Sequence, residues 1–202
     1  MILHVLNPGV SEEVIRQRRR LGQDRKDEVW NGEYMLMPDP TIEHQRLVKL
    51  LMALLAEVVE SEGRGEAFPG TNVSDRREGW KYNFRAPDIV VVLNDGRAIN
   101  CDTHWYGGPD FLVEIQSPRD KSEEKIPFYA ELGVRELLLI HRDSRRLRLL
   151  RHDGTGLIPV DADAKKWLTS EVVPLAFRRA ASGKKPRTDV RRTDSTAGRW
   201  VV

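Results

Sequence analysis

Three short apolar runs constrain the fold of this chain more than any other feature of its sequence. They span residues 89–93, 111–115 and 137–140, and each is rich in aliphatic residues. Runs of this length and composition are typical of strands that are buried on both faces. A helical segment, residues 120–132, lies between the last two runs and ends at Gly133. We therefore predict a β-α-β unit with a right-handed crossover, in a mixed sheet whose faces are covered.

An amphipathic helix should follow the proline-rich break at residues 38–40. Thr41 is suited to cap its first turn, and Gly63 and Gly65 are suited to end it. Its apolar residues recur every three or four positions: Leu47, Leu50, Leu51, Leu54, Leu55 and Val58. This spacing puts them on one face, which predicts a helix that packs against the sheet.

Two hairpins are expected outside these elements. Residues 27–37 place Asn31 and Gly32 between two half-apolar runs, and this dipeptide can supply the two positive φ values of a tight hairpin turn. Residues 145–152 and 157–160 flank a second turn, which predicts a peripheral hairpin at the edge of the sheet.

The composition along the chain divides it into a core and two appendages. The length of 202 residues fits one domain. Residues 1–26 are dense in charge and predict an N-terminal extension with a solvated helix capped by Ser11, and residues 27–177 hold the core. Residues 178–202 are rich in Arg, Lys, Ser and Thr with few apolar residues, so we expect a disordered basic tail.

Two carboxylates accompany the apolar runs. Glu114 stands inside the run 111–115, where a carboxylate is costly to bury unless it is paired or bound to metal. Asp88 directly precedes the run 89–93, so the two carboxylates meet if these strands pair. With the backbone carbonyl of Ile115 and water, they would suit a hard cation such as Mg²⁺. Such an ion can activate water and neutralise charge on a phosphodiester.

Lys125 is the candidate cation for this site, because it lies on the helix that follows the Glu114 strand. Ile126, Tyr129 and Leu132 define the apolar stripe of that helix, and Lys125 lies beside the stripe. An inward-facing ammonium could stabilise the charge that develops during phosphoryl transfer. The text DKSEEK is otherwise typical of a solvated helix face.

Five segments match a known family in order and spacing. They are EVWNGEYMLMP, EHQRLVKLLMALL, APDIVVV, FLVEIQSPRDKSEEKIPFYAELGVRELLLIHRD and LTSEVVPL. Through them, residues 27–177 resemble the Uma-type restriction endonucleases, a branch of the PD-(D/E)xK nuclease superfamily.

This resemblance implies an α/β, restriction-endonuclease-like fold with a central mixed sheet flanked by helices. It implies that Asp88 and Glu114 bind Mg²⁺ or Mn²⁺, and that Lys125 is the catalytic lysine, displaced from its usual strand position onto the helix. The implied activity is metal-dependent endonuclease cleavage of DNA.

Two further residues are candidates for the site. The third position of the E-x-K signature holds Gln116, which can orient water but carries no charge. Because side chains alternate along a strand, Gln116 should face the same side as Glu114 and join the site. The resemblance also places His44 at the start of the amphipathic helix that follows Thr41, where it could contact phosphate or water. A satisfied structural histidine is the alternative.

Other functions stay open on the sequence. Gln116 and the nearly neutral charge favour a catalytically decayed module that binds nucleic acid or protein without cleavage. A third alternative is an acid-base enzyme that uses His44 with Glu114. Only the predicted position of His44 at the start of its helix supports it. Read alone, Asp88 is a turn residue, and Asp120 is most simply the N-cap of its helix.

Charge and composition limit partners and location. The 33 basic and 31 acidic residues nearly cancel to +2, so attraction to DNA must come from a local patch. The single cysteine, Cys101, excludes an internal disulfide, and we expect a cytoplasmic protein without a membrane span or secretory signal. Cutting both DNA strands would require two sites, so a homodimer is expected, with Trp30, Trp80 and Trp105 as candidate contacts.

Overall fold

The computed structural model describes residues 3–4, 8–118, 121–180 and 186–202, with side chains from residue 12 onward. Its centre is a six-stranded sheet with the order β13-β12-β11-β10-β7-β4. The strands are β4 (Gly65–Pro69), β7 (Ile89–Leu93), β10 (Phe111–Gln116), β11 (Glu136–His141), β12 (Leu147–His152) and β13 (Leu157–Pro159). β10 and β11 are parallel and the other neighbours are antiparallel. The predicted mixed sheet is confirmed, with the peripheral hairpin at its edge.

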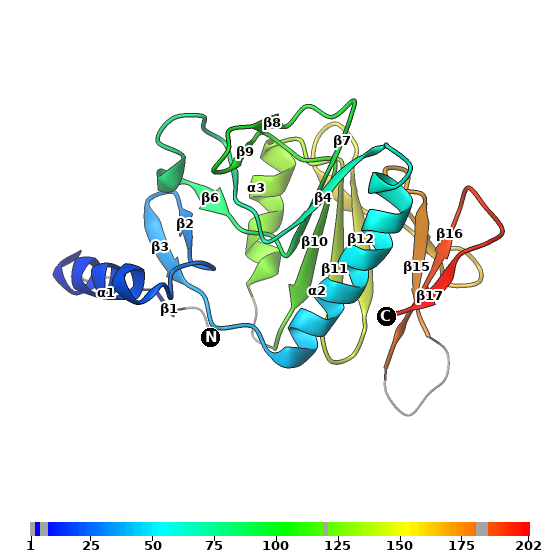
Figure 1. Ribbon diagram of the computed structural model, residues 1–202, viewed down its shortest axis with the longest axis horizontal. Coiled ribbons are helices and arrows are strands. Elements are labelled where there is room, and N and C mark those ends of the chain that lie inside the picture. Colours follow the sequence, from blue (N-terminus) through cyan, green and yellow to red (C-terminus); the bar gives the residue numbers. More distant parts are fainter. Residues whose placement is uncertain (1–2, 5–7, 119–120, 181–185) are drawn as a thin grey trace.

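Two helices, α2 (Ile42–Leu55) and α3 (Ile126–Glu131), cover opposite faces of this sheet (Figure 1). The alternation of side chains along β10 explains why both faces are buried. Phe111 and Val113 pack in the core that includes four of the five leucines of α2, whereas Leu112 packs in the core that includes Tyr129 of α3. An uninterrupted apolar run therefore supplies both cores. The fifth leucine, Leu50, is 38% exposed, so its predicted place on the packed face is wrong.

The start and end of α2 follow the predicted signals. The Thr41 side chain accepts a hydrogen bond from the backbone amide of His44, which satisfies a free donor of the first turn. The helix continues as a π-helical turn, η1 (Ala56–Glu60), before Gly63 adopts a φ of 64°. The predicted cap and glycine end are confirmed.

The helical connection between β10 and β11 is less regular than expected. Ser122–Lys125 form a 3₁₀ turn, η3, and α3 follows with Pro127 in its first turn, where proline costs no helical hydrogen bond. Gly133, with a φ of 80°, follows the end of the helix. Asp120, the expected N-cap, lies outside the described residues.

The N-terminal hairpin consists of β2 (Glu28–Trp30) and β3 (Glu33–Leu36). Its turn has φ values of 50° at Asn31 and 86° at Gly32, so the predicted Asn-Gly turn is confirmed. The hairpin belongs to a seven-stranded sheet with the order β1-β3-β2-β6-β5-β9-β8. Its other strands are β1 (Leu3–His4), β5 (Val73–Ser74), β6 (Phe84–Arg85), β8 (Ile99–Asn100) and β9 (Trp105–Tyr106). A 3₁₀ turn, η2 (Trp80–Tyr82), lies between β5 and β6 in the sequence.

The N-terminal extension contains α1 (Pro8–Leu21), which begins earlier than expected. Ser11 lies within this helix, so the prediction that it caps the helix is wrong. Pro8 suits a first helical position because proline fixes a helical φ and has no amide hydrogen to leave unpaired.

The C-terminal segment, expected to be a disordered tail, instead forms strands. The four-stranded C-terminal sheet comprises β14 (Leu168–Thr169), β15 (Leu175–Arg179), β16 (Thr188–Arg192) and β17 (Arg199–Val201). Phe177 and Val190 are each 1% exposed, while polar neighbours alternate with them on the other face. Composition alone missed this alternation, which lets a segment poor in apolar residues bury one side of a sheet.

Trp105 is buried at 8% exposure, so it is wrong as a candidate surface contact, and Trp30 and Trp80 are half-buried. In the described part of the chain, no helix combines the length and apolar character needed to cross a membrane.

Candidate active site

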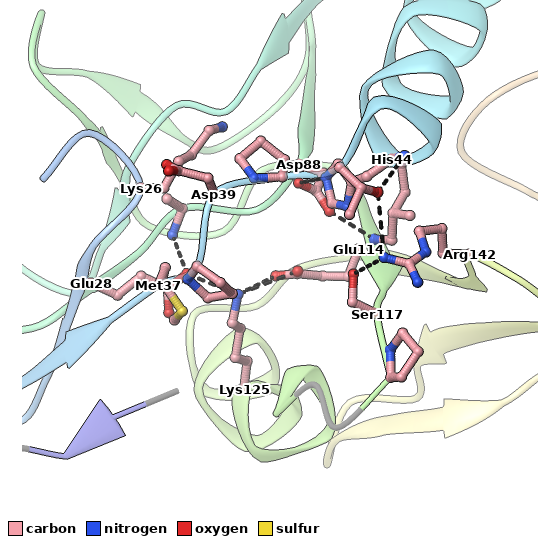
Figure 2. Close-up of a pocket in the computed structure, with 16 residues that line it drawn as sticks. Lys26, Glu28, Met37, Asp39, His44, Asp88, Glu114, Ser117, Lys125 and Arg142 are labelled. Atoms are coloured by element: carbon pink, nitrogen blue, oxygen red, sulfur yellow. Dashed lines mark hydrogen bonds and ion pairs between the residues drawn. The ribbon is translucent and has the colours of Figure 1, made fainter. Parts of the chain in front are cut away.

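A cleft of about 370 Å³ opens beside the end of β10, near the start of α2 and the N-terminal hairpin (Figure 2). Most residues that line it are polar, and they come from segments far apart in the sequence. Those labelled are Lys26, Glu28, Met37, Asp39, His44, Asp88, Glu114, Ser117, Lys125 and Arg142. The fold therefore gathers the predicted Asp88, Glu114, Lys125 and His44 around one cavity.

Glu114 lies in the buried part of β10 and is 3% exposed. Its Oε1 atom accepts hydrogen bonds from Lys125 Nζ at 3.0 Å and from the Tyr129 hydroxyl at 2.6 Å. Burial raises the pKa of Glu114 to about 8; the Lys125 charge opposes that rise and the Asp88 charge adds to it. The carboxylate predicted from the apolar run thus has the partners that its burial demands.

Lys125 is buried at the end of η3 and faces inward (Figure 2). Its Nζ atom lies 2.8 Å from Glu28 Oε1, and 3.0 Å and 3.3 Å from the two carboxylate oxygens of Glu114. Burial alone would lower the pKa of this lysine, but the two carboxylates outweigh it and hold the pKa above its ordinary value. The ammonium therefore stays charged between two acidic side chains, and the solvated-face alternative is wrong for this residue.

Glu28 is a site residue that the sequence reasoning missed. It is 1% exposed, and its Oε1 atom accepts hydrogen bonds from Lys125 Nζ at 2.8 Å and from the Ala86 amide at 2.9 Å. Its Oε2 atom accepts a hydrogen bond of 2.6 Å from Trp30 Nε1. Because Ala86 lies two residues before Asp88, Glu28 links the hairpin to the segment that carries the first carboxylate. The available signal was a charged residue at the start of a predicted hairpin strand.

Tyr129 was expected only as part of the apolar stripe of its helix. Its ring is packed in the core and fully buried, but its hydroxyl donates to Glu114. Burial, and next the Glu114 charge, hold the pKa of Tyr129 well above its ordinary value, so the hydroxyl keeps its proton and remains a donor. A buried tyrosine requires a partner for its hydroxyl, and this requirement was the signal available in the sequence.

Asp88 is held between α2 and β10. Its Oδ1 atom is joined to His44 Nε2 by a hydrogen bond of 2.8 Å, and its Oδ2 atom accepts a hydrogen bond of 2.8 Å from the Ile115 amide. The His44 and Asp88 side chains are 13% and 15% exposed, so both reach the wall of the cleft. The structure thus brings His44 into the predicted site through its contact with Asp88.

Gln116 does not join the carboxylates, and the expectation that it would is wrong. Its side-chain amide donates to Glu123 Oε1 at 3.0 Å, and Arg148 binds the same carboxylate at 2.6 Å and 2.7 Å. Gln116 is also absent from the lining of the cleft. It is the last residue of β10 and only half-buried, so its side chain can turn to an exposed ion pair.

The oxygen atoms that line the cleft are of the kind that binds a hard cation, but the described side chains do not surround a metal position on their own. Within the described ranges, no group of three or more His, Cys, Asp and Glu side chains is placed to hold a metal ion. Asp88 and Glu114 nevertheless line the same cleft with Ile115, whose carbonyl is a third oxygen. Two carboxylates with a backbone carbonyl and water are a donor set that Mg²⁺ accepts.

Comparison with known proteins supports the same fold. One solved structure, a crystal structure of a putative nuclease belonging to DUF820 from Anabaena variabilis ATCC 29413, is similar with a TM-score of 0.53. The two chains are 21% identical, and the match covers 67% of this chain and 76% of the other. A search of curated proteins finds no match.

The sequence itself matches the model of the Uma2 family over residues 12–182. That family is described as "Putative restriction endonuclease", and the matched range includes every residue placed in the cleft. The match also runs beyond the predicted core at both ends, into α1 and past β15. The match covers most of the chain, so the chain belongs to the Uma2 family, and this membership supports a nuclease function.

Proposed function

We propose that this protein is a divalent-metal-dependent endonuclease that hydrolyses phosphodiester bonds of DNA. The observation that carries the proposal is the buried Lys125, held by Glu114 and Glu28 in the cleft that Asp88 also lines. Burying an ammonium beside two carboxyl groups is costly for stability, and such clusters are concentrated at functional sites.

In this proposal, Asp88 and Glu114 hold Mg²⁺ or Mn²⁺ with the carbonyl of Ile115. The bound ion would activate a water molecule and neutralise charge on the phosphate. Lys125 presents a fixed positive charge to the same cavity, which stabilises the charge that develops at the scissile phosphate. His44 fixes the orientation of Asp88 through their 2.8 Å hydrogen bond.

The cleft also carries cations that suit an anionic substrate. Lys26 and Arg142 line it, and Arg142 lies within hydrogen-bond distance of Thr41 Oγ1 at 3.3 Å and of Ser117 Oγ at 3.5 Å. The Nε and Nη2 atoms of Arg142 are paired with Asp143 at 2.8 Å and 3.0 Å, so Nη1, which lies near Thr41 and Ser117, is the donor that could bind a phosphate in the cleft.

The direct test is nicking of supercoiled plasmid DNA with Mg²⁺ or Mn²⁺, with and without a chelator. Glu114→Gln and Asp88→Asn keep the side-chain shape and should abolish nicking, and Lys125→Met should reduce it strongly. Gln116→Ala is the matched control on the same strand and should retain activity. Nicking that survives Glu114→Gln in a folded protein would exclude the assigned site.

A second candidate is a decayed nuclease module that binds nucleic acid or protein without cleavage. The absence of a three-residue metal cage among the described side chains favours it. Titration with Mn²⁺ separates the two functions, because a nuclease site binds the ion in a manner that depends on Glu114. Binding that is absent, or that persists in Glu114→Gln, favours the decayed module.

Two further expectations belong to the proposal. A homodimer would bring together the two sites that double-strand cleavage requires, and light scattering of the purified protein tests it. A cytoplasmic location is proposed from the single cysteine, and fractionation of cells tests it.

A further inference from the structure

The C-terminal sheet lies on the other side of α2 from the N-terminal hairpin (Figure 1). Its residues line a second cavity of about 360 Å³. We call it the C-terminal basic pocket and define it by six of its lining residues: Lys165, Trp167, Arg178, Asp189, Arg191 and Arg199. None of them lines the cleft around Glu114.

The strand register explains why the charges gather here. Arg178 pairs with Asp189, and Arg191 pairs with Arg199, in the backbone register of β15, β16 and β17. Residues paired across antiparallel strands share a face, and the residues between them point to the opposite face. Phe177 and Val190 take that opposite face and pack in the core, so the arginines face outward.

Trp167 holds two of these arginines in place. The Cζ atoms of Arg178 and Arg191 each lie 4.5 Å from the centre of its ring. Trp167 is 8% exposed, so it acts as a packed support and not as a free stacking surface. Guanidinium groups stacked on a ring keep their planar donors available for a phosphate and lose less conformational freedom on binding it.

The donors of the two arginines are satisfied to different degrees. Arg178 binds Asp189 at 2.9 Å and 3.0 Å. Arg191 lies 4.0 Å from Asp163, and its buried Nε has no hydrogen-bond partner. Buried donors are normally paired, so Arg191 is less fully satisfied than Arg178, and its side chain, 37% exposed, offers its other guanidinium donors to a ligand.

The charge balance of the pocket favours an anion. Four cations line it with one carboxylate, Asp189, and a second carboxylate, Asp163, lies 4.0 Å from Arg191. Four cations against these two anions leave two positive charges in excess. The four cations are Lys165, Arg178, Arg191 and Arg199. The side chains of Lys165 and Arg199 are exposed at the pocket. The whole chain carries only +2, so attraction to a polyanion must come from such a local excess.

We propose that the C-terminal basic pocket binds the phosphate backbone of the DNA substrate at a distance from the cleavage site. This inference rests on the proposed function, because it takes DNA as the substrate. The pocket supplies affinity that is independent of base sequence, and it holds the duplex while the cleft performs cleavage.

Binding to a fluorescein-labelled DNA duplex tests the proposal, measured by anisotropy in the Glu114→Gln background without divalent metal, so that no cleavage occurs. Removing Arg191 and Arg199 together, as Arg191→Ala with Arg199→Ala, should weaken binding about tenfold at low salt. The slope of log affinity against log salt should fall by about one for each lost phosphate contact. Arg191→Lys keeps the charge but not the planar group, so it should give an intermediate loss.

Arg97→Ala is the matched control, because Arg97 is exposed in a loop away from both cavities. It should leave affinity and salt slope close to those of the parent. Titration of each arginine variant with Mn²⁺, in the chain with Glu114 restored, checks that the cleft is intact.

The outcomes separate this proposal from the proposed function. If the parent binds DNA and the double arginine variant binds it equally well with the same salt slope, the pocket is not a DNA site, whatever the nicking assay shows. Loss of affinity with a reduced slope supports the pocket even if no nicking occurs. If the folded parent does not bind DNA at any salt concentration, the proposal for the pocket is wrong, and the nicking assay decides the proposed function separately.

Discussion

The cleft and the C-terminal basic pocket have similar volumes, about 370 Å³ and 360 Å³, but the positively charged side chains in them have opposite surroundings. In the cleft, Lys125 is buried and held between the carboxyl groups of Glu28 and Glu114. In the pocket, Arg191 is partly exposed and supported by an aromatic ring. A buried charge is fixed in position and costly to disturb, whereas an exposed charge attracts a partner and contributes little to stability. The comparison indicates that the cleft is suited to catalysis and the pocket to the attraction of an anionic partner.

The largest effect should come from breaking the buried cluster. Lys125→Ala leaves Glu114 and Glu28 without their shared cation, so we expect the free energy of unfolding to fall by about 3–5 kcal/mol at pH 8. Because the pKa of Glu114 is already raised to about 8, that carboxyl can take up a proton, and the loss should be smaller at pH 6. Urea unfolding at both pH values measures this. An equal, small loss at both would contradict an ionised cluster.

The second effect concerns the pH dependence of metal binding. A carboxyl with a pKa of about 8 must release its proton to bind Mn²⁺, so affinity should rise by up to about tenfold per pH unit between pH 6 and 8 and then level off. Calorimetry in buffers of different ionisation enthalpy should show nearly one proton released at pH 7. In Glu114→Gln this proton release should disappear, and its persistence would assign the titration to another group.

A smaller effect should come from Glu28, which we predict to act through Lys125. Glu28→Gln leaves the ammonium with Glu114 as its only carboxylate partner in the cluster, so Mn²⁺ must compete with it and should bind about three- to tenfold more weakly. In a Lys125→Met background the same substitution should change Mn²⁺ affinity little. Equal losses in both backgrounds would make Glu28 a metal ligand and not a positioning residue.

The smallest effect on folding is expected in the pocket. Arg191→Ala should change the free energy of unfolding by less than about 1 kcal/mol, because its ion pair with Asp163 is long and exposed. Thermal unfolding measures this directly. A loss as large as that of Lys125→Ala would show that the arginine is structural, and it would remove the contrast between the two regions.

Much of the fold could be predicted because its signals are local. The Asn31-Gly32 turn, the Thr41 cap and the apolar runs of the central sheet each occupy a few adjacent residues, and the structure has all three. The C-terminal sheet was missed because its apolar residues are few and alternate singly with charges. A measure of overall composition cannot detect that pattern.

The candidate site was only partly predictable for a related reason. Glu114 could be found from its own apolar neighbours, whereas Lys125 was assigned mainly from the resemblance to the Uma-type family, because its local sequence is also typical of a solvated helix face. The contact of Glu28 with Lys125 joins residues 97 positions apart, and no local pattern reports such a pair. The prediction for Gln116 was wrong because strand alternation gives the face of a side chain but not its contacts. At the end of the strand, the side chain turns to Glu123.

The same sequence separation has a consequence for folding kinetics. Glu114 and Lys125 are 11 residues apart, so this half of the cluster forms by closing a short loop. The Glu28 half requires the N-terminal hairpin to dock across 97 residues of chain, a contact that high contact order makes slow. Full assembly of the cluster should therefore be among the last folding events. An enzyme built this way would acquire its cutting activity only after the rest of the molecule is in place.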